Sequence, residues 1–165
     1  MMCMEDEHRE LPQVAEKDID RRACLRLANV WEDARGSQNL PQLTNFGPAL
    51  ENDSLLDAFL LKAEEPVSLS VFVLCGGELA ARFETRLEGT TLAAMLPHQI
   101  RTQYFQACSQ ALHREQPVQL EGHYALSATT EMRYRSALLP VLATEPRGFG
   151  YLLGTLNTAR YPIVN

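Results

Sequence analysis

The sequence predicts an α+β fold: a five-stranded antiparallel sheet with helices on one face, preceded by an N-terminal amphipathic helix. Two apolar, β-prone runs, 57–64 and 67–75, meet at a polar break of hairpin length. Segments of helical periodicity follow, and three strand-like runs close the chain, at 118–127, 131–143 and 148–157. The connections between these last runs are short enough for antiparallel hairpins. Grouping the helices on one face of a single sheet is the layered arrangement that fits this order.

Length and composition are those of a globular domain. The chain has 165 residues, of which 45% are hydrophobic, enough to bury one core. The net charge of -6 disfavours binding to nucleic acid or an anionic membrane, because both require a basic face. The start of the chain is acidic, and no run approaches the roughly 18 apolar residues of a membrane span. We therefore expect no nucleic-acid partner, no membrane association and a cytoplasmic location.

The cysteines agree with that location. Cys3, Cys24, Cys75 and Cys108 are scattered along the chain, without a Cys-x-x-Cys pair. Disulfides persist in oxidising compartments, so scattered cysteines in apolar segments indicate a reducing one.

We expect one globular domain made of three segments. We expect residues 1–12 to form a flexible tail and residues 13–53 to form an N-terminal helix with its connector. Residues 54–165 should form the main domain. The connector is rich in turn-forming residues, and Phe46 and Leu50 are expected to anchor it. No repeat or low-complexity linker argues for a second domain. The chain ends soon after the last strand-like run, which favours a stand-alone domain.

The N-terminal helix should begin near Asp18 and end at Gly36, because glycine commonly terminates helices. An apolar stripe follows one side of this helix: Ile19, Ala23, Leu27, Val30 and Trp31, continued by Ala34. The stripe has two interpretations that a single helix does not separate. It covers the core of its own domain, or it pairs with a second subunit. Our prediction is a homodimer, with the first five of these residues as the interface candidates.

The run 67–75 alternates at its start, which predicts a strand with one buried face. The apolar positions of this alternation are Val67, Leu69, Val71 and Val73, set against Ser68 and Ser70. Phe72 and Leu74 add apolar side chains on the other face. We therefore expect the end of this strand to be covered on both sides.

Helical segments fill the middle of the chain after the glycine pair 76–77. Helical spacing relates Leu79, Ala80, Phe83 and Leu87. Thr90 or Thr91 is suited to cap a second short helix that runs through Met95 and Leu96, and the helix begins again at Pro97. The segment 98–115 is expected to be the longest helix. Its inner stripe consists of Ile100, Tyr104, Ala107, Ala111 and Leu112.

Together these features resemble the PAS-like domain family that is common in alphaproteobacteria. The resemblance covers about residues 25–157, and its motifs are Trp31, Arg35-Gly36, Pro41, Gly76-Gly77-Glu78-Leu79, Phe83, Leu87, Gly89, Leu138-Leu139-Pro140-Val141 and Leu152-Leu153-Gly154. Glu84 departs from the family, which usually has glycine at that place. The resemblance implies the PAS fold and a sensory or signalling role through small-molecule binding, protein contact or both. A stand-alone domain of this kind would need a signalling partner protein.

No catalytic or metal-binding pattern is evident in the sequence. The histidines His8, His98, His113 and His123 have no metal-ligand spacing. A haem axial ligand has no local signature, and the cysteine-containing helix motif of flavin-binding light sensors is absent, so neither haem nor flavin is expected. No nucleophile–base set or phosphate-binding motif occurs. We expect a protein that is not an enzyme; the alternative is a small ligand-binding enzyme with an unrecognised active site.

A small-molecule pocket would lie between the longest helix and the inner face of the sheet. Its candidate lining residues are Phe72, Phe83, Leu87, Met95, Tyr104, Tyr124, Tyr134 and Leu153. The alternative is that these side chains only fill the core, because buried aromatic residues contribute most to packing. The sequence does not separate these alternatives, and it identifies no ligand and no required cofactor.

Overall fold

The computed structural model describes residues 22–47, 57–83 and 86–164. Within them the chain forms a five-stranded antiparallel sheet with the strand order β2-β1-β5-β4-β3. The strands are β1 (Ala58–Lys62), β2 (Val71–Cys75), β3 (Val118–Ala125), β4 (Thr130–Val141) and β5 (Tyr151–Pro162). The predicted fold class and the antiparallel sheet are confirmed.

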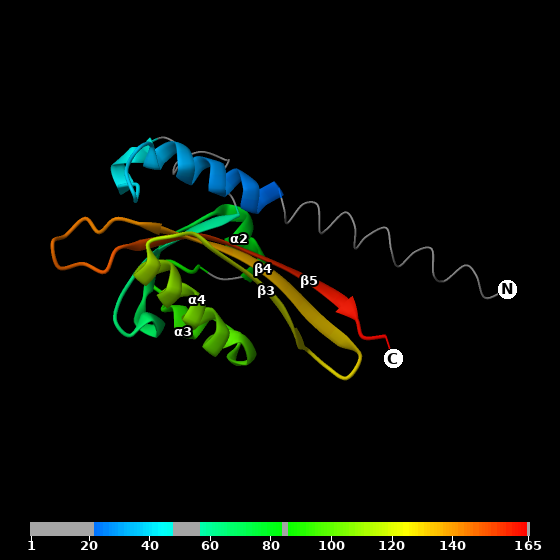
Figure 1. Cartoon of the computed structure of the whole chain (residues 1–165). Coiled ribbons are helices and arrows are strands. Elements are labelled where there is room, and N and C mark those ends of the chain that lie inside the picture. Colours follow the sequence, from blue (N-terminus) through cyan, green and yellow to red (C-terminus); the bar gives the residue numbers. More distant parts are fainter. Residues whose placement is uncertain (1–21, 48–56, 84–85, 165) are drawn as a thin grey trace.

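Helices lie on both faces of this sheet (Figure 1). On one side, which we call the inner face, are α3 (Leu92–Met95), the 3-10 turn η5 (His98–Ile100) and α4 (Arg101–Arg114). On the opposite side, the outer face, is the N-terminal helix, which is described over residues 22–35. The short helix α2 (Gly77–Phe83) follows β2 directly. The sheet is therefore the middle layer, and each of its faces needs its own apolar side chains.

Strand β1 shows how the sequence supplies both cores. Phe59 and Leu61 belong to the inner core, whereas Ala58 and Leu60 belong to the outer core. Consecutive residues of a strand face opposite sides, so a strand covered on both faces is apolar throughout. Further members of the inner core are Phe72, Leu79, Leu92, Leu96, Ile100, Tyr104, Leu138 and Leu152. Further members of the outer core are Leu27, Trp31, Phe46, Leu139, Val141 and Leu153.

Residues 67–70 form no strand, contrary to the prediction, because they build a 3-10 turn (η4, Val67–Leu69) ahead of β2. Ser70 is completely buried, and its Oγ accepts a hydrogen bond from the Glu64 N–H at 2.9 Å. Leu69 is 53% exposed. The serine is buried because its hydroxyl satisfies a backbone group of the turn. Burial here does not follow the alternation of residue types that predicted a strand.

The end of β2 is less covered than predicted. Phe72 is completely buried, but Val73 and Leu74 are 37% and 45% exposed. β2 is an edge strand of the sheet, with β1 as its only neighbouring strand among the described residues. Side chains near such an edge meet fewer packing partners, so the expectation of cover on both faces was wrong at this end.

The helix boundaries follow local signals that the sequence displays. Gly36 has φ +57°, the left-handed conformation that ends the N-terminal helix. Thr91 is the N-cap of α3, and its Oγ1 accepts a hydrogen bond from the Ala94 N–H at 3.3 Å. Phe46 is buried and anchors the connector, whereas Leu50 lies outside the described residues. The tail predicted at 1–12 also lies outside them.

Candidate functional site

Seven of the eight candidate pocket residues belong to the inner core or pack against it. Four of them are buried: Phe72, Leu87, Tyr104 and Tyr134. Three are partly buried: Phe83, Met95 and Tyr124. The structure therefore brings these seven together around the side chain of Tyr104, which reaches from α4 towards the sheet and is completely buried.

Leu153 does not belong to this group. It lies in the outer core with Trp31, whereas its neighbour Leu152 lies in the inner core. The two side chains face opposite sides because strand residues alternate. In a continuous apolar run the sequence does not show which residues face which side. The prediction of Leu153 as a lining residue of an inner pocket was wrong.

Polar groups inside the inner core are paired with one another. The Ser136 hydroxyl donates to the Thr155 carbonyl at 2.6 Å. The Tyr104 hydroxyl lies 2.7 Å from the Ser136 Oγ and must be the donor of that second bond, because the single serine proton is already used. The Tyr134 hydroxyl donates to the Gln103 Oε1 at 2.7 Å. These bonds fasten α4 to the middle strands of the sheet.

Burial keeps two groups of α4 protonated. Desolvation raises the pKa of Tyr104 above its usual value, and it raises the pKa of the Cys108 thiol to about 12. Both side chains are completely buried, one helical turn apart. A thiol that remains protonated at neutral pH is a poor nucleophile, so Cys108 is suited to packing rather than to chemistry.

The apolar stripe of the N-terminal helix packs against the outer face of its own sheet. Ala23, Leu27 and Trp31 are 5%, 2% and 3% exposed, and Val30 is partly buried beside them. The Trp31 indole N–H donates to the Pro140 carbonyl in β4 at 2.7 Å. These side chains are buried within a single chain. The prediction that they form a dimer interface was therefore wrong, and the alternative that the helix covers its own core is correct.

The helix packs on its own sheet because the outer face of that sheet is apolar. Leu139 in β4 and Leu153 in β5 lie on the outer face of the sheet and need an apolar cover. The helices on the inner face cannot supply it, and the N-terminal helix does. The fifth interface candidate, Ile19, lies outside the described residues.

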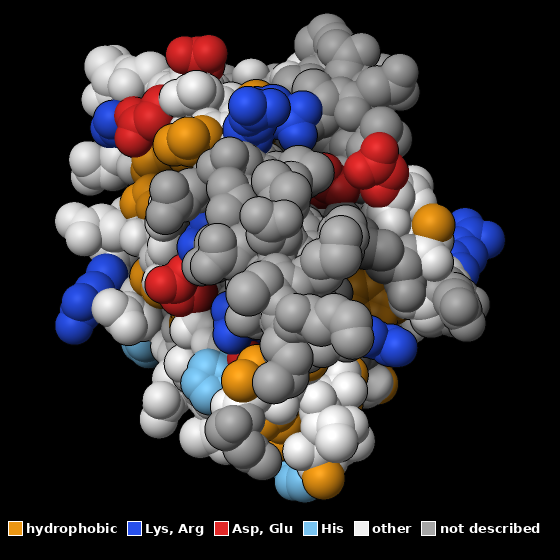
Figure 2. Space-filling model, turned by 90° about the vertical axis from the view of Figure 1, so that its right-hand side faces the viewer, with side chains coloured by type: hydrophobic (Ala, Val, Ile, Leu, Met, Phe, Trp, Pro, Cys, Tyr) orange, Lys and Arg blue, Asp and Glu red, His pale blue; other side chains and the backbone are white. Residues whose placement is uncertain are grey.

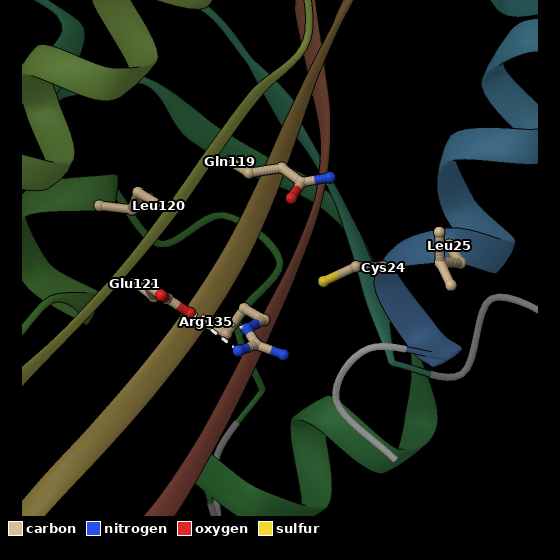
Figure 3. A pocket seen from close by; sticks show the side chains of 6 residues that line it. All are labelled: Cys24, Leu25, Gln119, Leu120, Glu121 and Arg135. Atoms are coloured by element: carbon tan, nitrogen blue, oxygen red, sulfur yellow. Dashed lines mark hydrogen bonds and ion pairs between the residues drawn. The ribbon is translucent and has the colours of Figure 1, made fainter. Parts of the chain in front are cut away.

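A cleft of about 420 Å³ opens between residues 24–25 of the N-terminal helix and the outer face of β3 and β4 (Figure 3). Cys24 and Leu25 line it from the helix, and Glu121 and Arg135 from the strands. The Arg135 Nη2 lies 2.8 Å from the Glu121 Oε2, and the Cys24 thiol lies 3.5 Å from the Thr155 hydroxyl. The cleft volume is in the range of small-molecule sites. The guanidinium of Arg135 in this cleft is already paired with the Glu121 carboxylate.

A groove of about 450 Å³ lies between α4, the segment 64–68 and the loop before β5. Its apolar lining includes Phe105, Leu112 and Phe149, the last of which is 52% exposed. The carboxylates of Glu64 and Glu65 lie at the same groove, and its described lining contains no lysine or arginine. An exposed aromatic side chain beside two carboxylates matches a binding partner that is apolar and positively charged.

Comparison with known protein families decides the family of this chain. A family model described as PAS domain matches residues 19–157, which is most of the sequence. The chain belongs to the PAS domain family. The matched range includes the N-terminal helix described over residues 22–35.

Two solved structures are similar to this PAS domain. The first is a domain of an HTR-like protein from Haloarcula marismortui, with a TM-score of 0.44 and 12% identity over 62% of this chain and 97% of that chain. The second is a fungal LOV domain photoreceptor, with a TM-score of 0.41 and 14% identity over 63% of this chain and 76% of that chain. Such low identities indicate nothing about ligand or partner. No curated protein matched the sequence.

The three described histidines of this PAS domain lie on three different elements. His98 lies in η5, His113 in α4 and His123 in β3, where its Nδ1 is 3.6 Å from the Glu131 carboxylate. Among the residues that the structure describes, no group of three or more His, Cys, Asp or Glu side chains could hold a metal ion. His8 lies outside those residues.

Surface and helix properties bear on the predicted partners. On the face shown in Figure 2, basic and acidic side chains are interspersed rather than gathered by sign. Over the described ranges, every helix is too short or too polar to span a bilayer. The absence of a nucleic-acid partner stays a prediction.

Sequence reasoning missed both the cleft and the groove. The groove is built from 64–68, from α4 and from Phe149, which are far apart in the chain. The only local signal for the groove was the turn at 146–148, which is followed directly by Phe149. Side chains next to such turns are commonly exposed, because loops run over the surface. Which element lies opposite that loop is a property of the tertiary fold.

Proposed function

We propose that this PAS domain is a signalling domain that acts by binding another protein, with an inner core that serves packing rather than cofactor binding. The observation that carries the proposal is the complete burial of Tyr104, hydrogen-bonded to Ser136 at 2.7 Å, where an inner pocket would lie. A ligand there would have to displace this side chain. It would also remove one of the two hydrogen bonds of the buried Ser136 hydroxyl, which contributes about 0.5–1.5 kcal/mol.

The groove beside α4 is the surface that supports contact with a partner. Phe149 offers an exposed aromatic ring, and Glu64 and Glu65 supply negative charge next to it. Apolar side chains at an interface contribute most of the affinity, and charges around them favour partners of opposite sign. The partner would therefore present an apolar side chain flanked by lysine or arginine.

A photoreactive benzoylphenylalanine at position 149, introduced in the native cells, tests this function. We expect a defined protein to be attached on irradiation, and the yield to fall several-fold when Glu64→Lys and Glu65→Lys are added. The matched control carries the photoreactive group at Val164, which is 72% exposed and lies at the other end of β5. Equal products from both positions, or a yield that ignores the charge reversal, would contradict the proposal.

Binding of a small molecule in the cleft at Cys24 and Arg135 is a second candidate, favoured by the cleft volume of about 420 Å³. If the domain acts only by binding another protein, freshly purified protein should carry no small molecule. Native mass spectrometry should then show no added mass, and the absorption spectrum should show no visible band. Added mass that disappears in Arg135→Ala would favour the cleft. Added mass that persists in this variant would indicate a ligand in the inner core and would overturn our view of that core.

A further inference from the structure

Among the described residues, the two edges of the sheet differ, because one is covered by a neighbouring segment and the other is not. Beyond β2, the segment 89–92 runs along the edge: the Phe72 N–H donates to the Thr90 carbonyl at 3.0 Å, and the Leu92 N–H donates to the Ser70 carbonyl at 2.8 Å. This edge is therefore occupied by the chain itself. Such cover is one of the ways in which proteins prevent the pairing of an edge strand with another molecule.

No described segment covers the β3 edge in this way. β3 is the last strand in the sheet order, with no strand beyond it among the described residues. Its 8 residues pair with β4 in an unshifted register, so no bulge bends the edge away, and they include neither proline nor lysine. The two strongly polar side chains, Glu121 and His123, already have partners on β4: Arg135 lies 2.8 Å from Glu121, and Glu131 lies 3.6 Å from His123. The usual protections of an edge strand are missing.

We propose that β3 pairs with the β3 of a second copy of this chain, antiparallel and about a two-fold axis at Gly122, so that the two sheets become continuous. The inference rests on the proposed function, in which the domain works through protein contacts. An antiparallel pair over 118–126 would form about eight to ten backbone hydrogen bonds, because every second residue pair exchanges two of them. A symmetric pairing needs a sequence that is complementary to itself, and β3 has one.

Charges on the outer face select this register. With the axis at Gly122, Glu121 of each copy lies opposite His123 of the other, which makes two carboxylate–imidazole pairs. An axis at Glu121 would place two carboxylates opposite each other, and an axis at His123 two imidazoles. Both alternatives set like groups face to face, which is unfavourable in a sheet.

The inner face is complementary in the same register. Leu120 lies opposite Tyr124 of the second copy, and Val118 opposite Leu126, which is 43% exposed in the single chain. Gly122 itself brings no side chain to the axis, where a Cβ would lie 2.7 Å from the Tyr134 hydroxyl. The Tyr134 side chain of the neighbouring strand occupies the place of that Cβ, so the single chain already requires glycine here.

Sedimentation velocity of the full chain over a wide concentration range tests the pairing. We expect the wild-type protein to dimerise reversibly, and Glu121→Lys or His123→Glu to weaken the dimer about tenfold or more. Glu121→Lys replaces the two carboxylate–imidazole pairs with lysine–imidazole pairs, and His123→Glu replaces them with two pairs of facing carboxylates. Mixing these two variants should restore the affinity, since the mixed dimer has Lys opposite Glu in one pair and Glu opposite His in the other. Glu145→Lys, an exposed residue of the β4–β5 loop, is the control with the same charge change.

Three outcomes would overturn the inference: a monomer at all concentrations, a dimer that Glu121→Lys leaves unchanged, or variants whose mixture does not recover. Circular dichroism of each variant confirms that it is folded, and the recovery on mixing also excludes misfolding as the cause of weak dimers. The crosslinking at position 149 reports on the partner groove independently. A monomeric wild-type protein that still crosslinks would reject the dimer and retain the proposed function.

Discussion

Trp31→Ala is expected to lower the free energy of unfolding by about 3–5 kcal/mol, the range for deleting a buried aromatic side chain. Trp31 is 3% exposed, packs in the outer core and donates its indole N–H to the Pro140 carbonyl at 2.7 Å. The substitution opens a cavity between the N-terminal helix and the sheet and leaves that carbonyl without this donor. Urea denaturation followed by circular dichroism measures the effect.

Two control variants show how much of the loss in Trp31→Ala comes from the buried position and how much from the indole donor. Leu25→Ala lies on the same helix, but Leu25 is 59% exposed, so its unfolding free energy should change by less than about 0.5 kcal/mol. Trp31→Phe keeps one aromatic ring but removes the indole donor and part of the buried volume, so its loss should be intermediate. If Trp31→Ala were as stable as Leu25→Ala, the helix would not be part of the core in solution.

Stability should fall steeply as the pH rises above about 9. Cys108 has its folded-state pKa raised from its usual 9.0 to about 12, and burial also raises the pKa of Tyr104 above its usual 10.0. Above pH 9 the unfolded chain releases the Cys108 proton while the folded chain keeps it, so the unfolded state binds fewer protons. The unfolding free energy then decreases with pH by up to about 1.4 kcal/mol per unit for each such group.

Both the direction of this pH dependence and the pH range in which stability is lost can be measured. The stabilisation due to Cys108 is complete below pH 9 and is lost between pH 9 and about 12, whereas the loss due to Tyr104 starts at about pH 10. Urea denaturation at a series of alkaline pH values should show a shallower slope for Cys108→Ala and for Tyr104→Phe. Ser109→Ala on the same helix introduces no titration change and should keep the wild-type slope. Identical slopes in all four proteins would show that the two groups are not buried in solution.

Local signals in the sequence were sufficient for the backbone of much of this fold. The hairpin-length connections determine an antiparallel sheet, Gly36 ends the N-terminal helix, and Thr91 caps α3. Such features depend on neighbours within a few residues, so the sequence displays them directly. The inner-core residues of α4 could be predicted for the same reason, because helical spacing places Tyr104, Ala107 and Ala111 on one side.

Only the tertiary structure decided which surface each apolar side chain faces. Leu152 and Leu153 are alike in the sequence but belong to opposite cores, and Ser70 is buried where Leu69 is exposed. The stripe through Leu27 and Trp31 was compatible with a second subunit or with its own sheet. These choices depend on contacts between residues far apart in the chain, which local periodicity does not encode. The same holds for the groove at Phe149 and the open β3 edge, because each depends on which distant element lies beside it.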